Sequence, residues 1–454
     1  YQPRTPDAPG GSGHGFYPGG VYEYEKTFDV PDAWRGKAVM LEFEGIYKNS
    51  TVLLNRHKVG GRAYGYSGFC VDAAPHLQYG AQNVLTVRAD NAQLPNSRWY
   101  TGGGIYRPVW LYVGEACHIA QAGVKITVLS YAPARVRVET TAVGAQTAQI
   151  GIEILRGNQI VAAAVGADVV LDIPHADLWS DETPNLYQCR AVLKQDNQVQ
   201  DEAIENFGIR VIEWSPKGLF INGKETLLRG GCVHHDNGIL GAATYAKSEE
   251  RRVRILKQAG FNAIRSAHNP CSAAMLQACD KYGMYLMDES FDMWYNRKNK
   301  YDYGCDFDRC WQEDTAAMVT RDYNHPSVIL YSVGNEVAEP HEQKGIEVGR
   351  AQIDLIHTLD KTRPVTCGVN LMILGRAAKG QGVYQDGAMS ADVNKRKEKT
   401  EKNQNASLAF NMMASFIGTG MNKGGNSLKV DALAAPFADS LDIVGYNYGS
   451  GRYP

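Results

Sequence analysis

The chain has 454 residues, of which 44% are hydrophobic and 21% are charged, a composition typical of globular proteins. This length exceeds what a single hydrophobic core usually serves, so two or three domains are expected. A formal net charge of -2 gives no electrostatic reason to expect nucleic acid or an anionic membrane as a partner, and no apolar run approaches the ~20 residues that span a bilayer.

The first half of the chain predicts two β-sandwiches. Short runs rich in Val, Leu and aromatic residues alternate with Gly, Asn and Pro turns, which favours a jelly roll over residues 1–117. Its expected strands are Val21–Val30, Ala38–Phe43, Ser50–Leu54, Asn83–Ala89 and Pro108–Val113. A second all-β domain is expected over residues 118–211, with strands at Arg135–Thr141, Gln149–Leu155 and Asn185–Leu193.

Residues 212–454 predict the α/β part of the chain, because short apolar strands alternate with amphipathic helices from Thr226 onward. A single series with polar residues at the strand ends favours a (β/α)8 TIM barrel over a doubly wound sheet. The expected strands are Leu227–Val233, Phe261–Ser266, Met284–Met287, Ser327–Val333, Val365–Val369 and Leu441–Tyr446. The expected helices are Glu249–Ala259, capped by Ser248, then Ala273–Tyr282, Phe307–Asp322 and Gly345–Leu359.

Only six barrel strands are expected before the sequence ends at Pro454. A complete barrel takes about 250 residues and eight strands, and a six-stranded one would leave two open edges. We therefore expect the chain to be a fragment of a longer protein whose barrel is incomplete at its C-terminal end. The polar stretch of about 376–430 is expected to hold a helix and a mobile loop near the barrel mouth.

Polar side chains follow nearly every expected barrel strand. They are His234-His235-Asp236, His268-Asn269, Asp288-Glu289, Asn335-Glu336, Asn370 and Asn447-Tyr448. Because the C-terminal ends of barrel strands form the mouth where reactions occur, this predicts a polar pocket for a hydroxyl-rich substrate.

The strongest local signal is the run Arg321–Glu336, RDYNHPSVILYSVGNE. A helix end, a turn and an apolar strand place the carboxyl of Glu336 at the mouth, with the amide of Asn335 beside it. Glycoside cleavage needs a carboxylic acid that protonates the leaving oxygen and a second carboxylate across the sugar. Glu336 is therefore the candidate proton donor.

That run, together with Asn262–Pro270 (NAIRSAHNP), resembles glycoside hydrolase family 2, the family of β-galactosidases, β-glucuronidases and β-mannosidases. Ser97–Arg107 (SRWYTGGGIYR) is similar to the jelly-roll motif of that family, and residues 118–211 resemble its immunoglobulin-like domain. One departure is Tyr331, where the family usually has Trp, and a packing change is expected there.

The resemblance implies a role for each residue that matches the family's motifs. Glu336 would be the acid/base, and Asn335 would bind a sugar hydroxyl beside it. The other residues expected to contact substrate are Asp236, His268, Asn447, Tyr448, Arg98 and Trp99. Purely structural roles stay open for Arg98, Trp99 and Tyr448. Glu289 would position Glu336 or Arg265, or would belong to an ion pair without catalytic importance.

The nucleophile is the gap in this reading. The family places it at the end of the seventh strand, which lies beyond the six expected here. None of the acids after Glu336 ends a further apolar strand, and Asp442 begins the sixth strand at the wrong end of the barrel. The catalytic pair is therefore expected to be completed by a Glu outside residues 1–454.

The motifs taken together predict a retaining exo-β-glycosidase that hydrolyses terminal β-D-galactosides by double displacement. Galactoside is favoured because Arg98 stands where the glucuronidase pattern has an acid. A β-glucuronidase of the same family is the alternative, and a non-catalytic carbohydrate-binding protein is a rival from another class. A metal held by His234, His235, Asp236 and His268 is a weaker possibility.

No cofactor or metal is expected, and the expected partners are a glycoside substrate and, as an option, further copies of the chain. Nine cysteines are scattered, odd in number and contain no C-x-x-C pair, so we expect mostly buried thiols rather than a disulfide framework or a zinc site. This favours a reducing compartment and a cytoplasmic location. A periplasmic or secreted location stays open because the sequence does not begin with Met.

Overall fold

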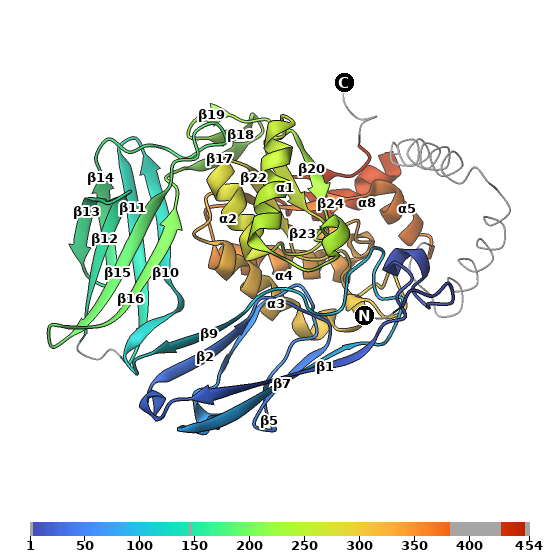
Figure 1. Ribbon diagram of the computed structural model, residues 1–454. Helices are drawn as coiled ribbons and strands as arrows, with labels where there is room; N and C mark the ends of the chain where they lie inside the picture. The colour runs from blue at the N-terminus through green and yellow to red at the C-terminus, as the bar shows by residue number, and fades with distance from the viewer. Residues whose placement is uncertain (1–2, 145–147, 382–427, 450–454) are drawn as a thin grey trace.

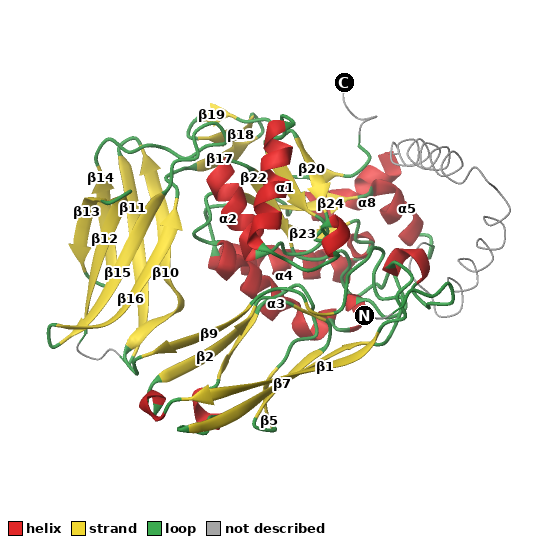
Figure 2. Ribbon diagram, in the orientation of Figure 1, coloured by secondary structure: helices red, strands yellow, loops and turns green. Residues whose placement is uncertain are grey.

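The computed structural model describes residues 3–144, 148–381 and 428–449 (Figure 1). Within these residues the chain forms two β-sandwiches and a sheet of parallel strands surrounded by helices (Figure 2). Most of the stretch of about 376–430, in which a helix and a loop were expected, lies outside the described residues.

The N-terminal sandwich packs a four-stranded sheet against a three-stranded one. The first sheet has the order β1 (Gly20–Val30), β7 (Ala81–Asn91), β4 (Ser50–Leu54), β5 (His57–Gly60). The second has the order β6 (Phe69–Asp72), β2 (Ala38–Phe43), β9 (Val109–Gly114), and a short pair joins β3 (Ile46–Tyr47) to β8 (Gly104–Ile105). Strand β2 buries every second residue, as a strand with one face on a core does. The five strands expected here are confirmed within a few residues.

The second sandwich has two antiparallel sheets and its own apolar core. Its first sheet has the order β10 (His118–Tyr131), β11 (Ala134–Val143), β14 (Asp168–Ile173). Its second has the order β13 (Gln159–Val165), β12 (Gln149–Arg156), β15 (Tyr187–Gln195), β16 (Gln198–Phe207). A small antiparallel sheet of β17 (Ile212–Ser215), β18 (Gly218–Ile221) and β19 (Lys224–Glu225) follows it. The domain limits at 117 and 211 stay a prediction.

The parallel sheet has six strands, each paired with the next one along the chain. They are β20 (Gly230–Val233), β21 (Ala263–Ser266), β22 (Tyr285–Glu289), β23 (Val328–Asn335), β24 (Val365–Val369) and β25 (Gly445–Tyr446). The sheet curls like part of a barrel (Figure 1). All six expected strands are present, but β20 begins three residues later than expected and β25 covers only the last two residues of the expected Leu441–Tyr446. Every residue of β23 is buried, as in a parallel strand covered on both faces.

The helices that accompany this sheet are α1 (Ala246–Gln258), α2 (Ala273–Tyr282), α3 (Phe307–Asp322), α4 (Gln343–Leu359), α5 (Leu371–Ala377) and α8 (Leu428–Ala438). Helices α2 and α3 have the bounds that the sequence predicts. The Oγ of Ser272 caps α2 by accepting the N–H of Met275 at 3.1 Å. The expected cap of α1 is wrong: the helix begins before Ser248, its N-cap is Tyr245, and no side chain caps it.

Five of the nine cysteines are buried, namely Cys117, Cys189, Cys271, Cys279 and Cys367, and all nine are free thiols. Among the described residues, no helix is both long enough and apolar enough to cross a membrane.

Candidate active site

Glu336 follows directly on the last residue of β23. Its backbone has a φ of 51°, in the left-handed region that non-glycine residues seldom adopt and that is found mostly at functional sites. Its N–H donates to the carbonyl oxygen of Gly368 on β24 at 2.7 Å, which holds the turn against the neighbouring strand. This turn places the carboxyl at the C-terminal edge of the parallel sheet, where Glu336 is only 8% exposed.

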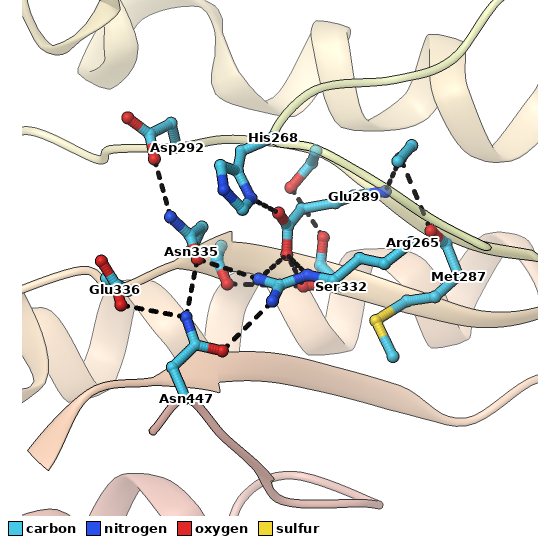
Figure 3. A network of polar contacts seen from close by, with 12 residues as sticks. Arg265, His268, Met287, Glu289, Asp292, Ser332, Asn335, Glu336 and Asn447 are labelled. Atoms are coloured by element: carbon cyan, nitrogen blue, oxygen red, sulfur yellow. Dashed lines mark hydrogen bonds and ion pairs between the residues drawn. The ribbon is translucent and has the colours of Figure 1, made fainter. Parts of the chain in front are cut away.

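The carboxylate of Glu336 is held by two neutral amides. Asn370 donates from Nδ2 to Oε1 of Glu336 at 3.0 Å, and Asn447 donates to the same oxygen at 3.2 Å. The side chain of Asn370 is itself oriented, because its Oδ1 caps α5 by accepting the backbone N–H groups of Met372 and Ile373. Asn447 follows the last residue of β25 and points toward Glu336 (Figure 3). Residues from three strand ends therefore meet at one carboxylate.

The side chain of Asn335 makes contacts through both ends of its amide. Its Oδ1 accepts from Nη2 of Arg265 at 3.0 Å and from Nδ2 of Asn447 at 2.9 Å. Its Nδ2 donates to Oδ1 of Asp292 at 2.9 Å. The second hydrogen of this Nδ2 has no acceptor among the described residues, since an amide nitrogen has two hydrogens.

Glu289 is fully buried at the end of β22 and is saturated with donors (Figure 3). Its Oε2 accepts from Arg265 at 2.6 and 3.0 Å and from Oγ of Ser332 at 2.6 Å, and its Oε1 lies 2.7 Å from Nδ1 of His268. Burial alone would raise the pKa of this carboxyl, but Arg265 and His268 hold it below its usual value. Glu289 therefore orients Arg265 and His268 as an anion.

Arg265 can reach this place because Gly368 lies beside it. A Cβ on Gly368 would come within 2.4 Å of Nη2 of Arg265, so any larger residue there would displace the guanidinium. Arg265 also donates from Nη1 to Oδ1 of Asn447 at 3.1 Å. One guanidinium thus links the ends of β22, β23 and β25.

Asp292 is a second buried carboxylate, in the loop after β22. Arg98 of the N-terminal sandwich binds both of its oxygens, at 2.5 and 2.9 Å, and Nζ of Lys298 lies 3.2 Å from Oδ1. Lys298 also donates to the backbone oxygen of Asn335 at 2.7 Å. Burial alone would raise the pKa of Asp292, but Lys298 and Arg98 hold it well below its usual range. The N-terminal sandwich is thereby tied to the site by a two-point ion pair.

The loop that carries Asp292 and Lys298 is anchored by two further buried carboxyls. Asp302 accepts the backbone N–H groups of Lys298 at 2.7 Å and of Asn299 at 2.6 Å. Glu339 accepts the N–H of Asn296 at 2.7 Å. Burial raises the pKa of Asp302 to about 6 and that of Glu339 to about 7.

Aromatic side chains lie beside these charges. The ring of Trp99 is 4.8 Å from that of His234 and 5.7 Å from that of His268, and the guanidinium of Arg98 lies 5.7 Å from the Trp99 ring. Tyr448 is half exposed, and its pKa is raised by partial burial and by the charge of Glu336. An amphipathic wall of this kind suits the stacking of a sugar ring.

The structure brings most of the predicted site residues together. Seven of them lie in one cluster of contacts or charges around Asn335: Arg98, Arg265, His268, Glu289, Glu336, Asn447 and Tyr448. Trp99 adjoins the cluster through His268. Asp236 is exposed after β20, and its charge acts on His234 and Tyr100 rather than on this cluster.

Asp292, Lys298 and Ser332 were not singled out from the sequence. Asp292 and Lys298 lie three and nine positions beyond the end of β22, in a loop without periodicity. The one available signal was that Asp292 continues the acidic run begun by Asp288 and Glu289. Asn370 was recognised as a strand-end residue, and it contacts Glu336.

The geometry does not support a metal ion bound by His234, His235, Asp236 and His268. Within the described ranges, no group of three or more His, Cys, Asp or Glu side chains is arranged to hold a metal ion. Nε2 of His235 donates to the carbonyl oxygen of Thr101 at 3.0 Å, and burial lowers the pKa of His235 to about 3.

Three family models match successive parts of the chain. They are described as the family 2 galactose-binding domain-like region at residues 18–101, glycosyl hydrolases family 2 at 117–210, and the family 2 TIM barrel domain at 212–423. The chain belongs to glycoside hydrolase family 2. The predicted family is confirmed, and so is the architecture of jelly roll, immunoglobulin-like sandwich and TIM barrel.

Known relatives of this family 2 chain carry two different names. A β-galactosidase of Bacteroides ovatus is 35% identical over 412 residues, which cover 80% of this chain and 48% of the relative. A putative β-glucuronidase of Formosa agariphila is 34% identical over 370 residues, covering 79% of this chain and 35% of the relative. A crystal structure of a family 2 member from Bacteroides cellulosilyticus, 34% identical, superposes with a TM-score of 0.82 over 100% of this chain and 53% of its own. The chain thus spans about half the length of these relatives or less.

Proposed function

We propose that this chain supplies the acid/base half of the active site of a retaining exo-β-glycosidase that hydrolyses terminal β-D-galactosides. The observation that carries the proposal is the placement of Glu336, an oriented carboxyl at the strand ends whose side-chain donors among the described residues are the neutral amides of Asn370 and Asn447. Glu336 protonates the leaving oxygen in the first step and then removes a proton from the attacking water in the second.

The residues around Glu336 bind and orient the sugar. The free N–H of Asn335 donates to a ring hydroxyl, and a hydrogen bond to the 2-OH strengthens in the transition state of such enzymes. Trp99 and His268 form the adjoining wall, and Tyr448 lies on the open side. Asp236, in the loop after β20, is proposed as a substrate contact farther from Glu336.

The nucleophile is proposed to lie outside residues 1–454. The two other carboxylates of the cluster are poor candidates, because Asp292 is bound by Arg98 and Lys298, and Glu289 is bound by Arg265 among other donors. In the complete protein, a retaining mechanism requires the partner carboxyl to lie about 5 Å from that of Glu336.

Galactoside is the proposed sugar because Asp292 already neutralises Arg98, the exposed cation on the jelly-roll side. A substrate carboxylate would have to compete for that guanidinium with the buried carboxylate of Asp292, which binds it at two points. The relatives include enzymes named for both sugars, so a β-glucuronidase is the alternative outcome of the test. A cytoplasmic location and assembly into a homo-oligomer stay predictions.

The test compares nitrophenyl β-galactoside, β-glucuronide and β-mannoside as substrates of the full-length protein. Glu336→Gln is expected to lower kcat by about 10²–10⁴-fold on the preferred substrate. Azide, which needs no general base, is expected to restore turnover of the variant and to give the β-glycosyl azide.

Glu347→Gln is the matched control, because Glu347 is exposed on α4 and is expected to leave kcat unchanged. Undiminished turnover by Glu336→Gln would contradict the acid/base role. Binding of sugars without hydrolysis by the wild-type protein would favour the non-catalytic alternative.

A further inference from the structure

A cavity of about 240 Å³ lies between the second sandwich and the N-terminal ends of the parallel strands, away from the candidate active site at their C-terminal ends. Its walls come from β10, from the end of β16 and the residues after it, from β17, from the turn before β23 and from the segment before β24. The residues that line it are Ile126, Thr127, Val128, Phe207, Gly208, Arg210, Val211, Ile212, Trp214, Tyr323, Asn324, Pro326, Lys361, Thr362 and Arg363. Three of these carry a positive charge, and none is an Asp or a Glu.

Two of the cations are buried side by side. Arg210 is 6% exposed and Arg363 is 2% exposed, and both donate to the carbonyl oxygen of Val328, at 2.9 and 2.7 Å. Asp360 is bound to Arg363 at 2.5 Å, so that charge is compensated. Arg210 forms no ion pair with any residue that the structure describes. A buried charge without a partner costs free energy, and burial together with Arg363 lowers the pKa of Arg210 to about 9.

The cavity has several N–H donors in its walls and no carboxylate. Arg210 uses Nε for the carbonyl oxygen of Pro326 and Nη2 for that of Val328, which leaves the two hydrogens of Nη1. The indole N–H of Trp214 and the ammonium of Lys361 also have no hydrogen-bond or ion-pair partner among the described residues. The carbonyl oxygens nearby are already occupied by the guanidiniums. A set of N–H groups of this kind matches an oxyanion rather than a cation or a neutral sugar.

We propose that this cavity binds a small oxyanion of about the size of phosphate, which neutralises Arg210 and joins the second sandwich to the barrel. The volume lies below the range of about 300–1,000 Å³ that is usual for larger organic ligands. The anion contacts Nη1 of Arg210 from one side and Lys361 from the solvent side. Because Arg210 also binds the carbonyls at the start of β23, occupancy stabilises the strand whose other end carries Asn335.

The probe is inorganic phosphate, added at low millimolar concentration and compared with sodium chloride of equal ionic strength. Titration calorimetry of the full-length protein is expected to show one saturable site per chain. Thermal unfolding is expected to show a Tm about 1–3 °C higher in phosphate than in chloride. A general salting effect of phosphate would raise the Tm of every variant equally, so the variants decide the matter.

Lys361→Gln is expected to weaken phosphate binding about three- to tenfold, because Lys361 is exposed and its charge is partly screened. Trp214→Phe keeps an aromatic ring, though a smaller one, and removes the indole N–H, and it is also expected to weaken binding. Lys194→Gln, an exposed lysine of β15 outside the cavity, is the matched control and is expected to bind like the wild type. Equal binding by all four proteins, or no difference between phosphate and chloride, would overturn the proposal.

Discussion

The substitution Asp292→Asn tests how the cations around the site are held. Asn has nearly the shape of Asp but no charge, and its Nδ2 would present hydrogens to Arg98 or Lys298, which are themselves donors. The wild-type carboxylate accepts from both of these residues and from Asn335. The variant therefore removes a buried negative charge beside two cations, and its Nδ2 replaces the oxygen that accepts from Nε of Arg98, whereas its Oδ1 can still accept from Asn335.

The expected cost in free energy of unfolding is about 2–3 kcal/mol at pH 7. Removing one partner of a buried ion pair costs about 3–5 kcal/mol. The expected cost is lower than this because the side chain of Arg98 is 38% exposed, so that water can solvate its charge in the variant. The side chain of Lys298 is only 18% exposed, so its charge is solvated less well. Because Arg98 and Lys298 lose the charge that holds them beside Asn335, the amide of Asn335 is held less rigidly, and kcat of the full-length protein is expected to fall by about 10–100-fold.

The difference in stability depends on pH with a definite sign. Arg98 and Lys298 hold the pKa of Asp292 below its unfolded value of about 3.9, so its stabilising contribution is fully present above about pH 5. The contribution is lost as the pH falls through the depressed folded pKa. Urea unfolding at neutral pH should therefore show the full gap between wild type and variant, and the gap should shrink in acid.

Asp172→Asn is the control for that experiment, because Asp172 pairs with Arg135 on the surface, where both side chains are at least half exposed. It should change the free energy of unfolding by less than about 0.5 kcal/mol. If Asp292→Asn were as small in effect as this control, with kcat within threefold of wild type, the inferred role of Asp292 would be refuted.

Two further substitutions test buried groups near the site. Tyr331→Phe removes the hydrogen bond from the Tyr331 hydroxyl to Oδ2 of Asp360, whereas the bond of Asp360 with Arg363 is kept. The substitution should lower the free energy of unfolding, measured in urea, by about 1 kcal/mol. A variant more stable than wild type would contradict this. The pKa of Glu339 is raised to about 7, so the folded chain binds its proton more tightly and this stabilisation is lost between about pH 4.5 and 7. The free energy of unfolding of Glu339→Gln should therefore rise relative to that of the wild type, by on the order of 2 kcal/mol, between about pH 5 and 8. A difference in the free energy of unfolding that does not change with pH would refute the assignment.

Much of the barrel could be predicted because its signals are local. Helix α2 begins after a Ser cap and ends before Gly283, so its bounds follow from neighbouring residues alone. Strand β23 is a continuous apolar run, and the residues after it must lie at the mouth. Glu336, Asn335 and Asn447 could be grouped for this reason before any contact was known.

Asp292 and Lys298 could not be predicted in the same way. Their loop has no apolar period, and its path is set by Asp302 and Glu339, of which Glu339 is about 40 residues away in the chain. The misplaced cap at Ser248 has a similar origin. A Ser before a helical run predicts a cap, but α1 begins earlier, and Ser248 instead contacts Asn237.

The arrangement of charge separates the three carboxylates of the site by what surrounds them. Glu289 and Asp292 are each bound by guanidinium groups, which favour the anion, so neither is suited to give up and regain a proton in each catalytic cycle. Glu336 has only amide donors among the described side chains that bind it, and a neutral donor favours the anion less strongly than a guanidinium does. Of the three carboxyls, Glu336 is therefore the one we propose as the proton donor.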